Sequence, residues 1–389
     1  MKTFSKSSIN LALSLILTGI ATVPVQAGSL SSNVALEIAT IGYATQNGGT
    51  TGGQNATSDN IYTVSTISKL KSALTENSGE PRIIQIKGII DVSGGTDYSS
   101  KKDQKKRSQL KVPSNTTIIG ITSKSGITNG SLIIKKVENV IVRNLYVESP
   151  VDVDPEFEDG DGWNAEWDGM NIIKSSNVWV DHMTFDDGSF TDDQYTTKDG
   201  WTYVQHDGEL DIKHGSDYIS ITNSVFKNHD KTMLIGHSAS NNKEDSGHLR
   251  VTLAYNIFSK VEQRTPRVRF GKIHSYNNLF KGDYTASTYA YKASYGLGYK
   301  GSILSENNVF NIDNLSDSNV CKIVDVKKSN STLNDEGSTL NGDSLDLSGC
   351  SKIPGNDISW SVPYSYSLRS TGSLVSYLNK NAGVGKLTL

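Results

Sequence analysis

The sequence predicts an all-β protein, a solenoid in which short parallel strands stack as a β-helix. Short segments rich in Val, Ile and Thr recur along the chain, and each ends in a polar residue followed by a closing apolar residue. The closing residues are 22 to 41 positions apart: Val147, Phe185, Phe226, Phe258, Phe280 and Phe310. Unequal repeats of this length are typical of solenoids whose turns carry insertions. No long helical periodicity interrupts the middle of the chain, which argues against βαβ units, while a β-propeller and a β-sandwich are the alternatives.

Asn occupies a similar place in most of these units, as at Asn144, Asn223, Asn278 and Asn308. Asn tolerates the left-handed backbone conformation, so it suits a tight turn between two strands. Stacked Asn side chains can also form hydrogen bonds from one turn of a solenoid to the next. The repeated Asn therefore supports coils that are stacked in register.

The first 27 residues have the pattern of a secretory signal peptide. Lys2 and Lys6 give a basic start, Leu11–Ala21 is apolar, and Val25–Ala27 ends in a small residue suited to cleavage. Neither this run nor any later segment reaches the roughly 18 apolar residues of a membrane helix. We expect residues 28–389 to be a single β-helix domain, exported as a monomer to the extracellular space or the periplasm.

The composition excludes one class of partner. The formal net charge is −3, and loss of two signal-peptide lysines takes it to about −5. A chain of this charge does not bind nucleic acid by general electrostatics. The two cysteines, Cys321 and Cys350, are expected to pair in an oxidising compartment, with two buried thiols as the alternative.

Two short helices and three long polar segments complete the expected elements. Residues 66–74 carry apolar side chains at helical spacing, and so do Leu374, Val375 and Leu378. Both helices are expected to cap the open ends of the solenoid. The polar segments are 101–111, 150–161 and 190–202. We expect them to form loops that collect on one side of the solenoid and mark the functional site. The acidic middle segment could hold a cation, but we favour a solvated loop.

Three carboxylates are candidates for a metal site. Asp207 and Asp211 lie four residues apart, and Asp168 lies upstream in the sequence Glu-Trp-Asp-Gly. Carboxylate oxygens are the ligands that Ca²⁺ prefers, and a solenoid can bring distant residues onto neighbouring turns. There is no EF-hand pattern, and surface acids that bind nothing are the alternative. The paired acids Asp186–Asp187 and Asp192–Asp193 are interpreted mainly as turn residues.

A cluster of three arginines lies in the sequence QRTPRVRFG, residues 263–271. Arginine is permanently charged and forms two hydrogen bonds with one carboxylate. In an extended strand Arg267 and Arg269 share one face, so the segment is interpreted as a grip for an anion, with a solvated basic strand edge as the alternative. Three histidines, His182, His206 and His229, are interpreted as structural, because no metal-binding or catalytic spacing surrounds them.

These segments together resemble the pectate lyases of polysaccharide lyase family 1. The resemblance is carried by five motifs in order: GWNAEWD (162–168), VWVDH (178–182), DGELDIK (207–213), HDKTMLIG (229–236) and RTPRVRFG (264–271). It implies a right-handed parallel β-helix and Ca²⁺ held by Asp168, Asp207 and Asp211. It also implies that Arg264 removes a proton, while Lys231 and Arg269 bind galacturonate carboxylates. The implied reaction is β-elimination on α-1,4-linked polygalacturonate, which leaves a 4,5-unsaturated end.

Three other functions are compatible with parts of this pattern. A pectin lyase acts on methylated chains without Ca²⁺, but it does not need the three carboxylates. A β-helical polygalacturonase would hydrolyse the same chain with paired inward acids. A secreted β-helical binding protein would not need Arg264 beside three carboxylates. The sequence therefore favours a pectate lyase that acts on a polyanion through Ca²⁺ and a few placed cations.

Overall fold

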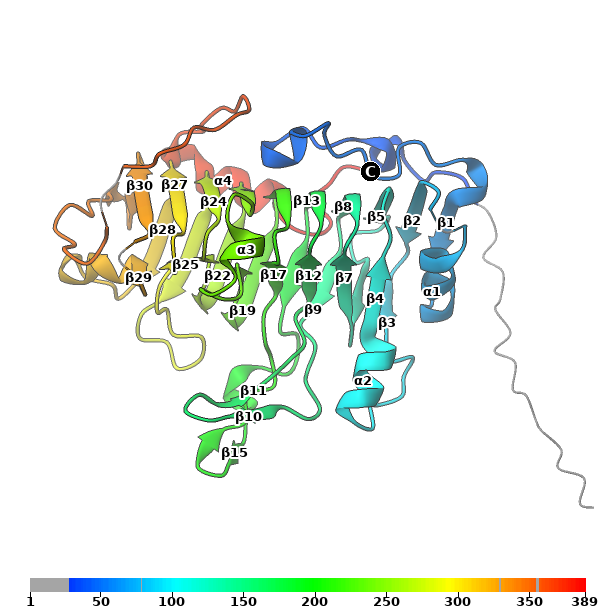
Figure 1. Cartoon of the computed structure of the whole chain (residues 1–389), viewed down its shortest axis with the longest axis horizontal. Helices are drawn as coiled ribbons and strands as arrows, with labels where there is room; N and C mark the ends of the chain where they lie inside the picture. Colours follow the sequence, from blue (N-terminus) through cyan, green and yellow to red (C-terminus); the bar gives the residue numbers. More distant parts are fainter. Residues whose placement is uncertain (1–27, 78, 329, 355–356) are drawn as a thin grey trace, which may run out of the picture.

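The computed structural model describes residues 28–77, 79–328, 330–354 and 357–389. The predicted signal peptide lies outside these residues. The described chain winds as a right-handed parallel β-helix built from three long sheets (Figure 1). This is the predicted fold. No helix in the described ranges is long and apolar enough to cross a membrane.

Each complete turn of the coil contributes one strand to each sheet, and neighbouring strands are parallel except for β32 at the C-terminal end. Sheet A contains β1 (Ile61–Val64), β2 (Arg82–Ile86), β5 (Thr116–Gly120), β8 (Glu138–Arg143), β13 (Ser176–Asp181), β18 (Asp217–Thr222), β21 (Arg250–Ala254), β24 (Lys272–Tyr276), β27 (Ser302–Glu306) and β30 (Thr332–Glu336). Sheet B contains β3 (Ile89–Asp91), β6 (Gly126–Thr128), β9 (Tyr146–Glu148), β14 (Thr184–Asp186), β19 (Val225–Lys231), β22 (Ile257–Gln263), β25 (Leu279–Asp283), β28 (Val309–Asp313), β31 (Thr339–Leu340) and the antiparallel β32 (Asp343–Ser344). Sheet C contains β4 (Gln109–Val112), β7 (Ser131–Lys135), β12 (Met170–Ile173), β17 (Leu210–Lys213), β20 (Leu234–Ile235), β23 (Arg267–Val268), β26 (Tyr295–Leu297) and β29 (Val324–Val326).

Shorter elements lie outside the three sheets. Two antiparallel hairpins protrude from the coil: β10 (Glu156–Glu158) with β11 (Gly162–Asn164), and β15 (Thr197–Lys198) with β16 (Trp201–Thr202). The α-helices are α1 (Ile67–Thr75), α2 (Lys101–Ser108), α3 (Asn242–Asp245) and α4 (Thr371–Asn381). The 3₁₀ segments are η1 (Asn33–Leu36), η2 (Gly42–Thr45), η3 (Ser58–Asn60), η4 (Asp192–Gln194) and η5 (Asp317–Ile323).

The core is a stack of phenylalanines that are the closing residues of the sequence repeat. The rings of Phe185, Phe226, Phe258, Phe280 and Phe310 are buried and nearly parallel, with neighbouring centroids 4.6–5.1 Å apart. Each closing residue lies level with the closing residue of the next turn. Burying such rings removes a large apolar area from water, at about 25 cal/mol per Å². The repeat read from the sequence is therefore the repeat of the core.

Asn residues at the sheet corners have both predicted roles. Asn144, Asn223, Asn277 and Asn307 adopt left-handed backbone, with φ between 47° and 54°. The neighbouring Asn side chains form a buried ladder, in which Asn256 donates to Asn278 at 3.0 Å and Asn278 donates to Asn308 at 3.1 Å. The ladder satisfies polar groups that would otherwise be buried without partners.

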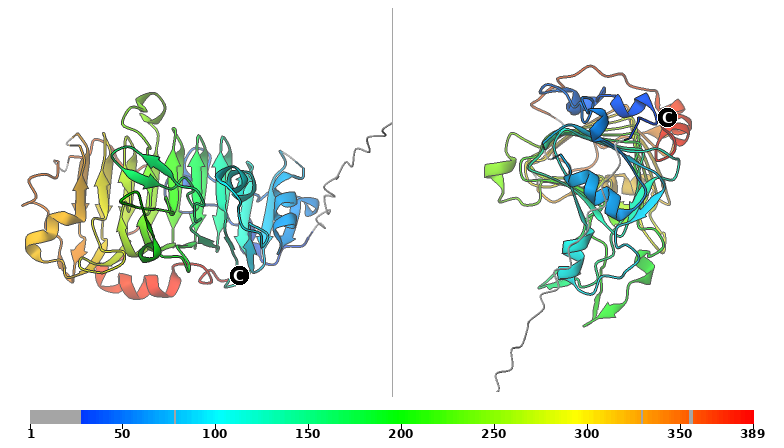
Figure 2. Two further views of the ribbon diagram at one scale, coloured as in Figure 1. Left: turned by 90° about the horizontal axis from the view of Figure 1, so that it is seen from below. Right: turned by 90° about the vertical axis from the view of Figure 1, so that its right-hand side faces the viewer.

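Helix α1 closes the N-terminal end of the coil, as predicted. Leu70, Ala73 and Leu74 pack into the main core, and the helix lies across the opening in the end-on view of Figure 2. Helix α4 forms as expected, but its predicted position as a cap is wrong. Its apolar side chains pack on the outside of the coil against Leu279 and Val309. The far end is instead covered by Leu345, Leu347 and Ile353, which pack against the core.

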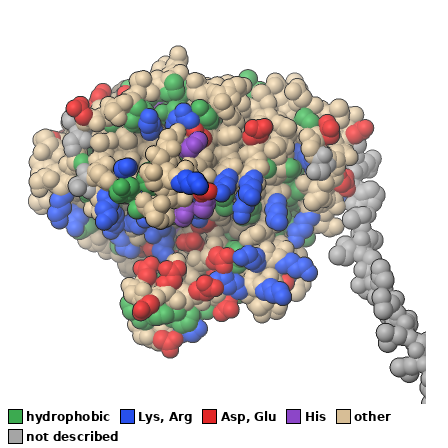
Figure 3. All heavy atoms as spheres, in the orientation of Figure 1, with side chains coloured by type: hydrophobic (Ala, Val, Ile, Leu, Met, Phe, Trp, Pro, Cys, Tyr) green, Lys and Arg blue, Asp and Glu red, His purple; other side chains and the backbone are tan. Residues whose placement is uncertain are grey.

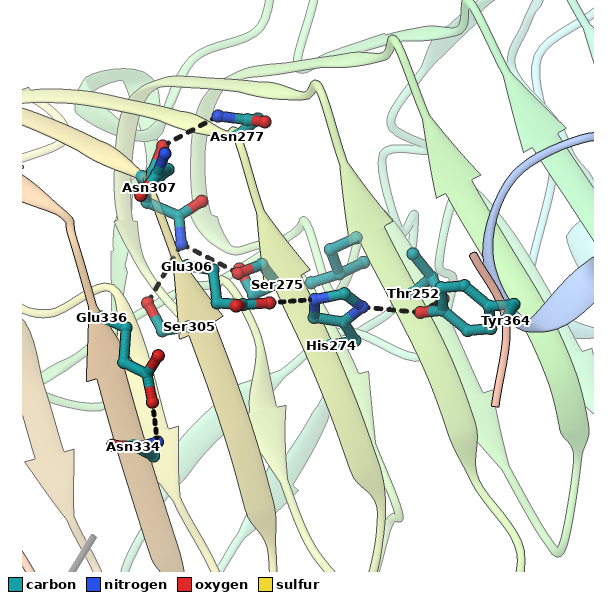
Figure 4. Close-up of polar contacts among 12 residues, drawn as sticks. Thr252, His274, Ser275, Asn277, Ser305, Glu306, Asn307, Asn334, Glu336 and Tyr364 are labelled. Carbon is teal, nitrogen blue, oxygen red and sulfur yellow. Dashed lines mark hydrogen bonds and ion pairs between the residues drawn. The ribbon is translucent and has the colours of Figure 1, made fainter. Parts of the chain in front are cut away.

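The segment between η5 and α4 is fastened to the coil at several points. The predicted disulfide joins Cys321 and Cys350. Further along, Tyr364 reaches the buried His274, whose two ring nitrogens lie 2.7 Å from Tyr364 Oη and 2.7 Å from Glu306 Oε2 (Figure 4). Burial lowers the pKa of His274, which favours the neutral ring.

The long connections leave sheet B and return to sheet C, on one side of the coil. They include α2 and the two hairpins, which hang together below the coil in Figure 1. This agrees with the prediction that the polar segments collect on one side. Sheet C and the protruding wall therefore frame the surface on which the candidate residues lie.

Candidate active site

The three predicted metal ligands lie near one another at the start of two neighbouring strands of sheet C. Asp168 precedes β12, and Asp207 and Asp211 lie before and within β17, which pairs with β12 in parallel register. Asp168 Oδ1 accepts a hydrogen bond from the Gly208 amide at 2.9 Å, and Asp211 Oδ1 accepts from the Leu234 amide at 2.9 Å. A Cβ at Gly208 would lie 2.6 Å from Asp168 Oδ1 and 2.9 Å from Asp211 Oδ1, so only glycine fits between the two carboxylates.

Lys213 lies between two of these carboxylates and was not identified from the sequence. Its Nζ is 3.1 Å from Asp168 Oδ2 and 2.8 Å from Asp211 Oδ2. The available signal was its position in Asp-Ile-Lys, because residues two apart in a strand share a face. The two contacts of Lys213 show that the carboxylates Asp168 and Asp211 attract positive charge to this part of the surface.

Burial and crowding leave the carboxylates short of positive charge. Burial, then the charge of Asp211, raises the pKa of both Asp168 and Asp207. The charges of Lys231, Lys213 and Arg264 oppose this shift at Asp207. Burial lowers the pKa of Lys213, but the charges of Asp211 and Asp168 outweigh it, so the net shift is upward. The ammonium therefore remains charged.

The carboxylates of Asp168, Asp207 and Asp211 are suitable ligands for Ca²⁺, although they do not form a closed metal site. No three or more His, Cys, Asp or Glu side chains are gathered closely enough to hold a metal ion, within the ranges that the structure describes. The carboxylates are hard oxygen donors, two of them are almost fully buried, and both contact the same ammonium. A cation that replaces the ammonium would find its ligands already on one surface.

Arg264 follows β22 and has an unusual backbone conformation. Its φ is 61°, in the left-handed region that an Arg seldom adopts, and such strain is often found at functional sites. Its buried Nε has no hydrogen-bond partner among the described residues. Its charge acts on Asp207, as noted above, so the structure brings Arg264 to the carboxylate group.

The two other arginines of the cluster have different partners. Arg267 Nη2 lies 3.2 Å from Asp325 Oδ2, so this arginine forms an ion pair within the protein and is not part of a free anion grip. Among the described residues, Arg269 donates only to two backbone carbonyls, that of Gly236 at 2.9 Å and that of His237 at 3.2 Å. Burial, then the charge of Arg264, lowers the pKa of both arginines, which shows that the three charges lie close together.

Lys231 ends β19 and touches the protruding wall. Its Nζ donates to Asn164 Oδ1 of β11 at 2.7 Å, which places the ammonium between the coil and the wall. The wall itself is held by Lys101, whose Nζ lies 2.8 Å from Glu156 and 2.9 Å from Glu166. The sequence therefore located Lys231 correctly near the carboxylates but gave no sign of its partner.

The acidic segment 150–161 is only partly the solvated loop that we favoured. Asp152 is fully buried and accepts hydrogen bonds from the amides of Asp154 and Glu166 at 2.9 Å each. Asp159 and Asp161 are exposed. Composition alone did not separate the acid that shapes the loop from those that face water.

A buried ion pair supports the site from behind. His229 Nδ1 lies 2.5 Å from Asp187 Oδ1, and His229 Nε2 lies 2.7 Å from the Asp207 carbonyl. Burial opposes the charged ring, but the charge of Asp187 outweighs it and raises the pKa of His229. The structural interpretation of His229 agrees with these contacts, whereas the interpretation of Asp187 as a turn residue is wrong. This pair was missed because its members are 42 residues apart in the sequence.

His182, which was predicted to be structural, and its neighbour Asp181 organise the coil. Asp181 is buried between the Arg143 guanidinium at 2.9 Å and His182 Nδ1 at 2.7 Å. Burial raises the pKa of Asp181. The hydrogen bond and charge of His182 and the charge of Arg143 outweigh burial and lower this pKa to about 2.

The sequence and the fold match known pectate lyases. The model of the pectate lyase family matches residues 11–387. Pectate lyase A of Dickeya chrysanthemi is 52% identical over 99% of this chain and 98% of its own, and pectate lyase D of the same organism is 54% identical over 98% of each. A structure of a pectate lyase bound to a hexasaccharide superposes with a TM-score of 0.84 at 30% identity, over 92% of this chain and all of that one.

These matches extend over nearly the whole length of both sequences, and they agree with the order of motifs and with the parallel coil described above. The chain belongs to the pectate lyase family and is an enzyme of the polysaccharide lyase class.

Proposed function

We propose that this protein is a Ca²⁺-dependent pectate lyase that cleaves α-1,4-linked polygalacturonate by β-elimination. The observation that carries the proposal is the arrangement around Asp207. A group of buried carboxylates lies within electrostatic reach of Lys231, Lys213 and Arg264 on one open surface. A site that combines oxygen donors with several cations suits a substrate whose every unit carries a carboxylate.

The metal requirement rests on the donor set. Asp168, Asp207 and Asp211 would hold Ca²⁺, with the Lys213 ammonium giving way to it. When bound there, Ca²⁺ supplies Lewis-acid polarisation of the galacturonate C6 carboxylate, which acidifies the adjacent C5 proton.

The residues of the chain carry out binding and proton transfer. Lys231 and Arg269 bind substrate carboxylates, since both present cationic groups that have no acidic partner among the described residues. Arg264 takes the C5 proton, the electrons of the C5–H bond form the C4–C5 double bond, and the C4–O bond breaks. The oxygen leaves on C1 of the other fragment and takes up a proton from solvent, so that it becomes the reducing-end hydroxyl of that fragment. The remaining fragment carries the 4,5-unsaturated non-reducing end.

Arginine is an uncommon base because it normally stays protonated, with a pKa above about 12. Arg264 stands among other cations, because its charge acts on both Arg267 and Arg269. The unpartnered Nε of Arg264 also means that one hydrogen bond that would stabilise the cation is missing among the described residues. Both features favour Arg264 as the group that receives the proton.

The proposal includes export and a monomeric state. Export is supported by the signal-peptide pattern of residues 1–27 and by the disulfide between Cys321 and Cys350. Sequencing the N-terminus of the secreted protein and measuring its mass in solution test the two statements. An uncleaved N-terminus or a stable dimer would contradict them.

An absorbance assay tests the reaction. The protein is incubated with polygalacturonate, and formation of the unsaturated end is followed in the ultraviolet, with and without a calcium chelator. We expect absorbance to rise only when Ca²⁺ is present. No rise rejects a lyase, and a rise that is indifferent to the chelator rejects the Ca²⁺ requirement.

The variant Arg264→Lys tests the base. It keeps a positive charge but loses the guanidinium, so kcat should fall by about 10² to 10⁴, the range for loss of a positioned base. KM should change little, because substrate binding rests on Lys231 and Arg269. Turnover close to that of the unsubstituted enzyme would reject the assignment of Arg264.

A further inference from the structure

His229 and Asp187 form a buried pair behind the candidate active site, and the proposed chemistry does not use it. The side chain of His229 is 1% exposed, and that of Asp187 is fully buried. His229 Nδ1 lies 2.5 Å from Asp187 Oδ1, and His229 Nε2 lies 2.7 Å from the carbonyl oxygen of Asp207. An ionised carboxylate and a carbonyl can only accept hydrogen bonds, so both ring nitrogens donate and the ring is an imidazolium. The ring therefore connects a buried carboxylate to the main chain of a predicted metal ligand.

Asp207 differs from the two other predicted ligands in how its carboxylate is held. The carboxylates of Asp168 and Asp211 each accept a hydrogen bond from a backbone amide at 2.9 Å. Among the described residues, the carboxylate of Asp207 has neither a hydrogen bond nor an ion pair, although the charges of three cations act on it. Figure 3 shows the band of Lys and Arg side chains on this face of the molecule, above the acidic side chains of the protruding wall. A carboxylate without a hydrogen bond can turn toward such charges, so its position depends on its main chain.

The main chain of Asp207 is fixed where the strand ladder of sheet C begins. The next residues are held by neighbouring turns: the Gly208 carbonyl accepts from the Gly169 amide at 2.9 Å, and the amide of the following residue donates to the Thr232 carbonyl at 3.0 Å. The carbonyl of Asp207 lies one residue earlier, and within the part of the chain that the structure describes its partner is the His229 ring. A side chain thus takes the place of a ladder partner at the residue that carries the ligand.

Tyr289 fixes the other end of the pair. Its hydroxyl donates to Asp187 Oδ2 at 2.8 Å, so both oxygens of that carboxylate have a partner. Tyr289 belongs to the connection between β25 and β26, and it is buried with a φ of 55°, a left-handed conformation that Tyr seldom adopts. Backbone strain of this kind is often found at functional sites. The contacts therefore form a series from Tyr289 through Asp187 and His229 to Asp207.

We propose that His229 is a positioning residue for Asp207, and that Asp187 and Tyr289 orient its ring. By holding the Asp207 carbonyl, His229 keeps the carboxylate available to Ca²⁺, so that it does not turn to one of the cations beside it. The proposal rests on the proposed Ca²⁺-dependent function and adds to it the residues that adjust the Ca²⁺ affinity. His229, Asp187 and Tyr289 take no part in substrate binding or proton transfer.

Two amide substitutions of His229 separate its two contacts. The amide nitrogen of Gln reaches approximately the position of Nε2, so His229→Gln keeps a donor to the Asp207 carbonyl. The amide nitrogen of Asn reaches approximately the position of Nδ1, so His229→Asn keeps a donor to Asp187 and loses the bond to Asp207. Both variants lack the positive charge of the ring, so the difference between them reports the bond to the carbonyl.

The measured quantity is the Kd for Ca²⁺, obtained by calorimetry on the substrate-free protein. Loss of a group that orients a metal ligand typically lowers metal affinity by about 10- to 100-fold, so His229→Asn should have a Kd about tenfold higher than that of His229→Gln. The Ca²⁺ concentration for half-maximal cleavage of polygalacturonate should shift in the same way. At saturating Ca²⁺ kcat should stay within about threefold, because the proton-transfer and substrate-binding residues are unchanged. A role in stability alone would lower the unfolding temperature of both variants without separating their Ca²⁺ affinities.

Tyr289→Phe is a milder variant, which keeps the pair and removes only the hydroxyl that orients it. It should raise the Kd for Ca²⁺ by about three- to tenfold, as expected for loss of one hydrogen bond. The control is Tyr364→Phe, which removes a hydroxyl that contacts His274 on sheet A and should leave this Kd unchanged. These two variants test the proposal even where the substitutions at His229 prevent folding.

The possible results separate this proposal from the proposed function. Equal Ca²⁺ affinities of His229→Asn and His229→Gln, or weaker binding by His229→Gln, overturn the role of His229. Equal affinities of Tyr289→Phe and Tyr364→Phe overturn the orienting role of Tyr289 and Asp187. An unsubstituted protein that forms no unsaturated product, or forms it without Ca²⁺, overturns the proposed function itself.

Discussion

Replacing Lys213 by Met should reveal the charge deficit of the candidate metal site in the metal-free protein. Met keeps most of the length and the apolar stem of Lys but has no charge. In the unsubstituted protein the ammonium lies 3.1 Å from Asp168 and 2.8 Å from Asp211, whose side chains are 2% and 6% exposed. The substitution leaves both carboxylates buried without that partner.

The size of the effect follows from these distances. At an effective dielectric constant of about 20, each contact near 3 Å contributes about 5 kcal/mol of Coulomb attraction. Dehydration of the charges offsets most of this, and removal of one member of a buried pair typically costs about 3 to 5 kcal/mol. The Lys213 side chain is 20% exposed, so we expect a loss of about 3 kcal/mol in the free energy of unfolding. Burial and Asp211 already raise the pKa of Asp168, so proton uptake should reduce the loss at lower pH.

The assay is thermal unfolding with a chelator and with added Ca²⁺. Without metal, Lys213→Met should unfold about 6 °C lower than the unsubstituted protein, at about 2 °C per kcal/mol for a chain of this size. Added Ca²⁺ should raise the midpoint of the variant by more than that of the unsubstituted protein, because no ammonium has to be displaced. The control is Lys227→Met, which removes a more exposed pair with Asp186 on sheet B. Equal midpoints for the two metal-free proteins, or a smaller Ca²⁺ effect in the variant, would refute the reasoning.

Three further predictions concern the coil and the arginine cluster. Asp181→Asn removes a carboxylate whose pKa is lowered from 3.8 to about 2, a difference worth about 2 kcal/mol. Because the folded pKa is depressed, this contribution is present above pH ~4 and is lost as pH falls toward 2, so urea unfolding should show the deficit at neutral pH and little of it near pH 2. Phe258→Ala should cost about 3 to 5 kcal/mol in chemical unfolding, since it opens a cavity in the middle of the ring stack, whereas Phe157→Ala on the exposed wall should cost less than about 1 kcal/mol. Arg267→Met should lower stability, because it removes the ion pair with Asp325, and it should leave KM for polygalacturonate nearly unchanged. Arg269→Met should raise that KM. The reverse pattern would exchange the roles of the two arginines.

The periodic features of the fold could be predicted because they depend on local patterns that every turn repeats. The closing phenylalanines are the buried ring stack, and the repeated Asn residues make the left-handed corners and the ladder. The position of α4 could not be predicted in the same way. Its amphipathic sequence shows that one face must be covered, but Leu374 and Leu378 fit the outside of sheet B as well as an open end.

The features of the candidate site also differ in whether the sequence could predict them. Asp168, Asp207, Asp211 and Arg264 were found because each belongs to a compact motif. Their supporting contacts were not found, because those contacts join turns that are far apart in the sequence. Asp187 and His229 are one example, and Asn164 with Lys231, separated by 67 residues, is another. The strand register that brings such pairs together is a property of the stacked coil and is not visible in either segment alone.

The distribution of charge explains how an acidic chain can hold an acidic polymer. At physiological salt, exposed charges farther apart than about 8 Å are largely screened, so the net charge matters less than the charges next to the substrate. In the wall beside the site, Glu156 and Glu166 are paired with Lys101, and Asp152 is buried under backbone amides. In the candidate metal site, Asp168 and Asp211 share the single ammonium of Lys213. Under the proposed function, Ca²⁺ bound there would cancel the remaining negative charge and bind a carboxylate of the substrate.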